Sequence, residues 1–324
     1  MPTKAPITRA YCVQLDEVLS IAEARRAFFS LPEPRSRFDF LCSSEACRTL
    51  GTKVTAANYD KQPNETYKAA HFRENPHSSH APDCEWMADE EDEEDEDAEG
   101  KLPGESEAEA RQRHARRKLH DYIDVFEPPV ERARPNADKP DTPAAPVRKP
   151  AGTPEEAPAP RNEKKSANQR TSSLERLVEC YRQARLELGD DEFKAMRLRV
   201  VGEGEMPLGA YFKAIKYAKL GNANRVLQGG ALLVDRYGSG FKLKFYDRID
   251  NKPVFLYISK EQMDAYRFKG YLDGLLREEV DYFRVFAMGE LALSPSGKSL
   301  DLRVADLRQL VLIPGIKKAP ATEA

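Results

Sequence analysis

Long apolar runs are missing from this chain of 324 residues. No stretch approaches the roughly 18 consecutive apolar residues of a membrane-spanning helix. The first residues, Met1 to Pro6, also lack the apolar centre of a secretory signal. We therefore expect a soluble, cytoplasmic protein with no membrane partner.

Histidine is scarce, and its distribution limits the chemistry available to the chain. All five histidines precede residue 121, so the second half of the chain has no imidazole for acid-base catalysis. No serine or cysteine lies in the sequence context of a nucleophile elbow. We therefore expect a protein that is not an enzyme. The alternative is a hydrolase whose general base is an aspartate or glutamate that the sequence does not single out.

Cysteine is equally scarce, but three of the five cysteines share one segment with three of the histidines. An odd number of cysteines fits a reducing compartment better than a disulfide framework. Cys42 and Cys47 are separated by four residues, and His80 and Cys84 by three. Thiolate and imidazole are donors that Zn²⁺ prefers, four of them in a tetrahedron.

These spacings predict a structural zinc site formed by Cys42, Cys47, His80 and Cys84. His77 and His71 are the alternative nitrogen donors. The competing interpretation is that the cysteines are simply small buried side chains. That is what we expect of Cys12 and Cys180, which lie outside the cluster.

The order of residues around this cluster resembles that of one known family. Phe40-Leu41-Cys42, then His71-Phe72-Arg73, then His80-x3-Cys84 is similar to the N-terminal zinc module of the competence protein CoiA family. The resemblance covers about residues 38 to 86 and implies nucleic-acid handling. This chain has four residues between the first two cysteines, where the family has two. It also lacks the strand-borne Asp and Glu-x-Lys of a two-metal cleavage site, so we expect no nuclease activity.

The net charge of −3 conceals an uneven distribution. Residues Asp89 to Asp97 and Glu99 contribute ten negative charges, so the rest of the chain carries +7. Such a run repels itself and is typical of a disordered segment. A second interpretation is that the run mimics nucleic acid and competes for a basic surface elsewhere in the chain. In that case, deleting residues 89–99 tightens nucleic-acid binding at low salt.

Composition divides the chain into segments and predicts an α+β fold. The expected segments are a helix with a zinc module (1–88), an acidic disordered tract (89–104), a basic helix (105–127), a Pro-rich linker (128–170), a helical subdomain (171–228), an OB-like β-barrel (229–316) and a disordered tail (317–324). In the first segment, an amphipathic pattern predicts a helix over 11–30. In the helical subdomain, Ser172 and Glu175 have the spacing of a capping box, and a second helix is expected over 207–220.

The OB-like prediction depends on the order of strands and helices. Strands are expected at 231–235, 241–247 and 253–259, a helix at 260–279, and strand segments at 282–293 and 300–313. This order resembles that of OB-fold nucleic-acid binders. Basic and aromatic residues alternate with apolar ones along these strands, as a surface for single-stranded nucleic acid requires. The candidate residues are Arg236, Tyr237, Lys242, Lys244, Tyr246, Arg248, Tyr257, Arg284 and Arg303.

Three classes of function fit these features. The first is a non-enzymatic protein that binds nucleic acid, single-stranded DNA in particular, with a zinc module and an OB-like barrel joined by a flexible linker. The second is an adaptor or sensor of a bacterial mobile element or anti-phage defence system, with a protein partner. The third is the hydrolase described above.

Overall fold

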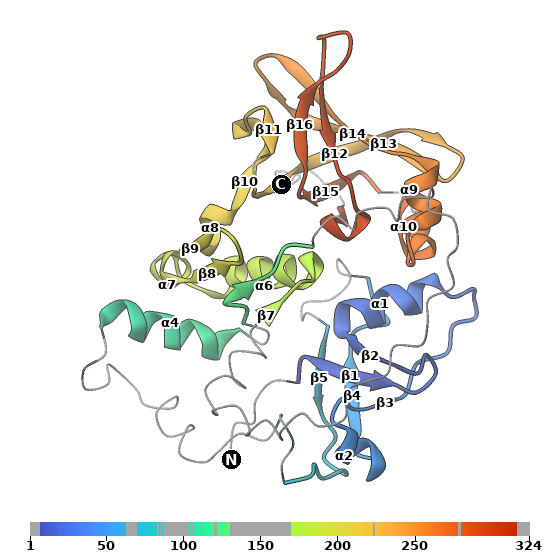
Figure 1. Ribbon diagram of the computed structural model, residues 1–324, viewed down its shortest axis with the longest axis vertical. Helices are drawn as coiled ribbons and strands as arrows, with labels where there is room; N and C mark the ends of the chain where they lie inside the picture. Colours follow the sequence, from blue (N-terminus) through green and yellow to red (C-terminus); the bar gives the residue numbers. More distant parts are fainter. Residues whose placement is uncertain are drawn as a thin grey trace, which may run out of the picture.

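The computed structural model describes residues 7–62, 70–82, 84, 86, 104, 106–119, 122–129, 170–222, 224–277 and 280–315. The chain combines helices with three sheets, which confirms the predicted α+β class (Figure 1). The acidic run at 89–99, most of the predicted linker (130–169) and the predicted tail (317–324) lie outside the described residues.

The N-terminal unit is built on an antiparallel sheet with two helices. Its strand order is β2-β1-β3-β4-β5. The elements are β1 (Arg9–Cys12), β2 (Glu17–Ser20), α1 (Ile21–Ser30), β3 (Phe40–Cys42), α2 (Glu45–Thr49), β4 (Lys53–Ala57) and β5 (His71–Glu74). Aromatic rings fill its interior, where Tyr59 packs edge to face against Phe28 and Phe40 with centroids 5.4 Å away.

The helix predicted over 11–30 is wrong for its first half. Residues of that half form the β1–β2 hairpin, and the helix begins only at Ile21. The side chain of Ser20 accepts a hydrogen bond from the amide of Glu23, and the Glu23 carboxylate accepts one from the amide of Ser20. This reciprocal cap satisfies two amides at the helix start and therefore sets the boundary.

The middle unit has a four-stranded sheet of order β7-β6-β8-β9 and several helices. Its elements are α4 (Glu107–Lys118), β6 (Val125–Phe126), β7 (Arg170–Thr171), α6 (Leu174–Glu187), α7 (Asp190–Ala195), β8 (Arg197–Val200), β9 (Gly204–Pro207) and α8 (Leu208–Tyr211). The cap of α6 is Ser173, one residue after the predicted one. Glu175 is therefore the second residue of the helix and not the third, which a capping box requires, and its side chain is buried.

The helix predicted over 207–220 is also wrong. Only the four residues of α8 are helical, and β10 (Phe212–Ala214) and the 3₁₀ turn η1 (Ile215–Tyr217) follow. β10 pairs in parallel with the start of β12, which places Phe212 opposite Val226. Strand pairing and burial of Phe212 thus replace the helical hydrogen bonds that the sequence pattern suggested.

The C-terminal unit is a nine-stranded sheet. Its main order is β11-β16-β17-β14-β13-β12-β15-β18, with β10 also paired to β12. The elements are β11 (Gly221–Asn222), β12 (Val226–Tyr237), β13 (Gly240–Ile249), β14 (Lys252–Ile258), α9 (Lys260–Ala265), α10 (Lys269–Arg277), β15 (Tyr282–Ala287), β16 (Glu290–Leu293), β17 (Leu300–Arg303), η2 (Leu307–Gln309) and β18 (Leu310–Gly315). The predicted strands at 231–235 and 241–247 lie within β12 and β13, and the predicted strand at 253–259 lies in β14 except for its last residue, Ser259.

Three expectations for this unit change. The helix predicted over 260–279 is two helices, because the chain is extended at Tyr266 (ψ 123°). The strands do not close into a barrel within the described part of the chain, because β11 and β18 stand at the two ends of the hydrogen-bonded order. Each of the last two predicted strand segments is also divided, into β15 and β16 and into β17 and β18.

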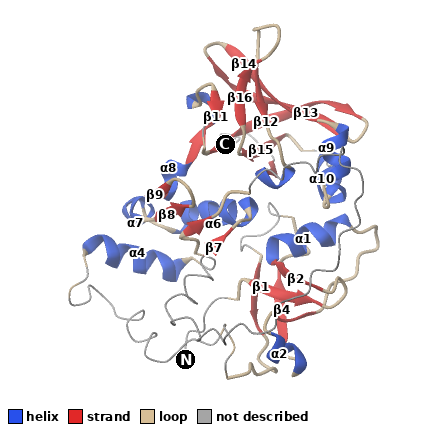
Figure 2. Cartoon of the chain, viewed as in Figure 1, coloured by secondary structure: helices blue, strands red, loops and turns tan. Residues whose placement is uncertain are grey.

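The N-terminal and C-terminal units share one apolar core. Helix α1 packs against α10 (Figures 1 and 2). Gly270 allows this approach, because a Cβ at that position would lie 3.1 Å from the Ser30 backbone. The hydroxyl of Ser30 also accepts a hydrogen bond of 3.2 Å from the amide of Tyr271. None of the helices in the described ranges has the length and apolarity needed to span a bilayer.

Candidate metal centre and sheet surface

Four predicted metal ligands converge at one end of the N-terminal sheet. Cys42 is the last residue of β3 and Cys47 lies in α2, whereas His80 and Cys84 lie in the segment after β5. The turn from β3 into α2 accommodates the four residues between the first two cysteines. The ligand atoms of all four side chains lie within 4.8 Å of one another.

The separations of these atoms fit a tetrahedral ion. Zn–S bonds of about 2.3 Å and Zn–N bonds of about 2.0 Å place neighbouring donors about 3.5 to 3.8 Å apart. The sulfurs of Cys42 and Cys84 are 3.6 Å apart. Nδ1 of His80 lies 3.7 Å from the Cys47 sulfur and 3.3 Å from that of Cys84. The donor set therefore fits a metal ion in both geometry and chemistry.

The surrounding backbone holds the cysteines in place and affects their ionisation. The amide of Ala81 donates a hydrogen bond of 3.2 Å to the Cys47 sulfur. Burial acts to raise the pKa of the Cys47 thiol, but the hydrogen bonds to it, led by that from Ala81, outweigh burial and lower the pKa. Burial dominates at Cys42 and Cys84 and raises the pKa of both thiols. A bound cation would offset this cost by stabilising the thiolates.

A second set of contacts orients the ligands. Nε2 of His80 faces Oε1 of Glu74 at 3.7 Å, and the imidazole is only 2% exposed. A carboxylate behind a ligating histidine fixes the orientation of the ring and increases its basicity. The indole of Trp86 donates a hydrogen bond of 2.7 Å to the Ser43 hydroxyl, which ties the chain after Cys84 to the turn after Cys42. The sequence alone does not indicate Glu74, because only the fold brings it behind His80.

The two alternative histidines do not belong to the cluster. His77 is exposed, and its backbone amide donates a hydrogen bond to the Asn75 side chain. His71 lies in β5, opposite Ala57 of β4. His80 is therefore the nitrogen donor of the site.

The outer surface of β13 carries four of the predicted nucleic-acid-binding residues. Burial alternates along this strand, with Phe241, Leu243 and Phe245 in the core. Lys242, Lys244, Tyr246 and Arg248 occupy the alternate positions and lie on the outer face. Tyr246 is 49% exposed, and so is Tyr257 on the neighbouring strand β14. The Lys242 ammonium lies 4.3 Å from the ring centroid of Phe255, also on β14.

Most of the remaining predicted nucleic-acid-binding residues are exposed, but one of them forms an ion pair with a helix. Arg284 and Arg303 are exposed on β15 and β17. Tyr237 is 45% exposed and packs edge to face against Tyr257, with centroids 5.9 Å apart. Arg236 differs, because its guanidinium forms an ion pair with Asp273 of α10. It is therefore a packing residue between sheet and helix.

No family model, curated protein or solved structure matches this chain. The function is therefore inferred from the geometry and chemistry of the metal centre and of the sheet surface. A pocket that no sequence pattern indicates lies beside β12, and it is formed by residues of the segment 207–220, which was predicted as a helix, together with Arg225 and Gln228.

Proposed function

We propose that this protein binds single-stranded nucleic acid on the outer face of β13 and β14 and is not an enzyme. The main observation behind the proposal is a row of side chains that project from the solvent side of the sheet. These are Lys242, Lys244, Tyr246 and Arg248. Within the described ranges, Lys244 and Arg248 form no ion pair with a carboxylate. Their charges are therefore available to phosphate groups.

The pairing of strands supports an OB-like interpretation of the sheet. β12, β13 and β14 form a meander, and α9 and α10 follow it before β15. β15 then returns to pair with β12, and β17 pairs in parallel with β14. OB-folds are partly open Greek-key barrels that bind oligonucleotides on the face of their second and third strands. Those strands correspond to β13 and β14.

The chemistry of this face suits a single strand better than a duplex. Tyr246 and Tyr257 expose flat rings beside cations. Stacking of a base on such a ring contributes about 1 to 3 kcal/mol, and it requires an unpaired base. Lysine and arginine between the rings contact the phosphates and make the affinity dependent on salt.

The metal centre has a structural role in this proposal. Three thiolates and one imidazole fill the four positions of a tetrahedral Zn²⁺ ion, which leaves none for a substrate or a reactive water. Cys42, Cys47, His80 and Cys84 would hold the ion, which would supply folding energy to a unit of short strands. The resemblance to the CoiA family module supports the choice of zinc and a nucleic-acid-related role.

A protein partner is the second candidate, because two apolar side chains are exposed on β12. Leu232 is 38% exposed and Val234 is 45% exposed. Leu232 lies opposite Lys244 in the register, beside the proposed nucleic-acid surface. In an adaptor or sensor of a mobile-element or defence system, these residues would contact protein.

Titration of labelled oligonucleotides against the full-length protein tests the proposal. Single strands and a duplex of the same sequence are compared at two salt concentrations by fluorescence anisotropy. We expect the single strand to bind more tightly than the duplex at both, and its affinity to fall as salt rises. If neither the single strand nor the duplex binds at low salt, the proposal is contradicted and a protein partner is favoured.

A further inference from the structure

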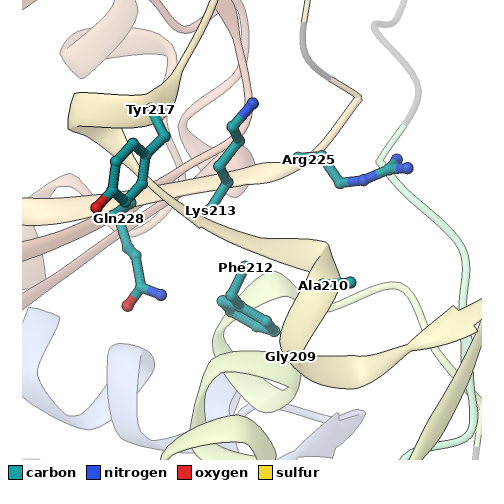
Figure 3. Close-up of a pocket in the computed structure, with 8 residues that line it drawn as sticks. Gly209, Ala210, Phe212, Lys213, Tyr217, Arg225 and Gln228 are labelled. Atoms are coloured by element: carbon teal, nitrogen blue, oxygen red, sulfur yellow. The ribbon is translucent and has the colours of Figure 1, made fainter. Parts of the chain in front are cut away.

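An open pocket of about 680 Å³ lies beside the start of β12. It is built by α8, β10, η1 and the first residues of β12. The lining residues are Gly209, Ala210, Phe212, Lys213, Ala214, Tyr217, Arg225 and Gln228. Figure 3 shows Lys213 between Tyr217 on one side and Arg225 on the other, with Phe212 below.

The pocket carries positive charge. Lys213 is partly buried, and no carboxylate in the described part of the chain lies within ion-pair distance of its ammonium. Arg225 is held in place by an ion pair with Glu203 and by a hydrogen bond of 2.7 Å to the Asn224 carbonyl. Among the described residues, the pocket is therefore lined by one lysine that no carboxylate pairs and by one guanidinium that Glu203 holds in place, a combination that suits a phosphate group.

An aromatic side chain stands at the edge of the same pocket. Tyr217 is 64% exposed, and the ammonium of the adjacent Lys216 lies 4.9 Å from its ring centroid. A large ring held in solvent beside cations is suited to stacking on a nucleobase. The opposite wall is rigid, since Phe212 stacks on Tyr181 of α6 at 3.9 Å and the Gln228 amide donates a hydrogen bond of 3.0 Å to the Tyr181 hydroxyl.

The pocket opens beside the proposed nucleic-acid surface. Side chains at alternate positions of β12 share one face, so Gln228 of the pocket lies on the same side as Gly230 and Leu232. Tyr246 packs over Gly230, where a Cβ would lie only 2.9 Å from the tyrosine ring. Leu232 is opposite Lys244. The outer face of β13 is therefore continuous, through Leu232 and Gly230 of β12, with the side of β12 on which Gln228 lines the pocket.

We infer that this pocket binds a nucleoside phosphate, with the base on Tyr217 and the phosphate between Lys213 and Arg225. A free mononucleotide and the phosphorylated end of a nucleic-acid strand share this chemistry. For a strand end, the inference rests on the proposed function, because the strand then lies on the outer face of β13. For a free nucleotide, it does not depend on that proposal.

Binding of matched ligands to three variants tests the inference. AMP represents the free nucleotide, and labelled single strands of one sequence with a 5′-phosphate, a 3′-phosphate or two hydroxyl ends represent the strand. The variants are Lys213→Gln and Tyr217→Ala in the pocket, with Lys219→Gln as the control. Lys219 is an exposed cation close in sequence that does not line the pocket. Unchanged urea midpoints establish that each variant is folded.

We expect a strand with one phosphorylated end to bind about tenfold more tightly than the hydroxyl-ended strand. Lys213→Gln and Tyr217→Ala should each remove most of this preference and weaken AMP binding, while Lys219→Gln retains both. Equal affinities for all three strands, together with no AMP binding at millimolar concentration, would overturn the inference and leave the proposed function intact. AMP binding that is lost in Lys213→Gln, without binding of any strand, would support the pocket and contradict the proposed function.

Discussion

Arg26 of α1 and Glu175 of α6 form an ion pair in which both side chains are buried, 8% and 3% exposed. Arg25 lies 3.7 Å from the same carboxylate and also pairs with Glu179. Burial alone would lower the pKa of Arg26, but the neighbouring carboxylate of Glu175 outweighs it and raises the pKa. Arg26 also donates a hydrogen bond of 2.9 Å to the Tyr266 hydroxyl. The N-terminal unit is thus joined to α6 of the middle unit by buried charges and to the C-terminal unit by the hydrogen bond to Tyr266.

Glu175→Gln should destabilise the protein strongly. The substitution keeps the shape of the side chain but leaves the Arg26 guanidinium buried without its counter-charge, which costs about 3 to 5 kcal/mol. Glu33→Gln is the control, because Glu33 is 75% exposed in its ion pair with Arg35 and such pairs contribute about 0 to 1 kcal/mol. Urea unfolding of both variants measures the difference. Equal midpoints for the two would show that the buried pair does not stabilise the junction.

Cys84→Ala should abolish binding of the proposed zinc ion, because three remaining donors bind Zn²⁺ more weakly than four. Cys12→Ala is the matched control, since Cys12 is also fully buried in the N-terminal unit but lies outside the cluster. Metal content of the purified proteins by mass spectrometry should give one zinc per chain for the wild type and for Cys12→Ala, and little for Cys84→Ala. Full zinc content in Cys84→Ala would exclude the proposed ligand set.

Glu74→Gln should retain the ion but bind it less tightly. The carboxylate faces the ring nitrogen of His80 that does not point to the cluster, and loss of such a partner weakens metal binding about 10- to 100-fold. Competition with a chromophoric chelator measures this change. An affinity equal to that of the wild type would mean that Glu74 does not orient the imidazole.

Two glycines should respond to alanine in opposite directions. At Gly289, between β15 and β16, a Cβ would lie 2.2 Å from the Arg303 carbonyl oxygen, so Gly289→Ala must displace backbone. At Gly274, inside α10, nothing lies within 4 Å of a Cβ, and alanine there should stabilise the protein by about 1 kcal/mol. Thermal unfolding should lower the midpoint for the first variant and raise it for the second. A lower midpoint for both would contradict the structure at α10.

The convergence of Cys42, Cys47, His80 and Cys84 could be predicted because their donor types and spacing in the sequence are typical of a metal site. The strands β12 to β14 could be predicted for a similar reason, since Phe241, Leu243 and Phe245 alternate with polar residues. By contrast, the apolar residues within 11–18 occur at helical spacing, but the pairing of β1 with β2 in a hairpin determines the structure of this segment. The cap at Ser20 was present in the sequence and marks where the helix begins.

Features that depend on long-range contacts could not be predicted. Glu175 has the spacing of a capping residue, but its carboxylate is used by Arg26, which lies on a distant helix. The pocket combines Lys213, Tyr217 and Arg225 from different elements, and parallel pairing of β10 with β12 brings them together. No local pattern encodes such pairings. The ion pair of Arg236 could not be predicted for the same reason, because its partner Asp273 belongs to α10.

The salt dependence of single-strand binding tests the central claim most directly. The triple variant Lys242→Gln, Lys244→Gln, Arg248→Gln removes three cations from the outer face of β13. The control triple variant Lys194→Gln, Arg197→Gln, Arg199→Gln removes three exposed cations from α7 and β8. Each phosphate contact contributes about 0.7 to the slope of log K against log salt, so we expect the slope to fall by about 2 in the β13 variant and to stay unchanged in the control. A wild-type slope in the β13 variant would contradict the account.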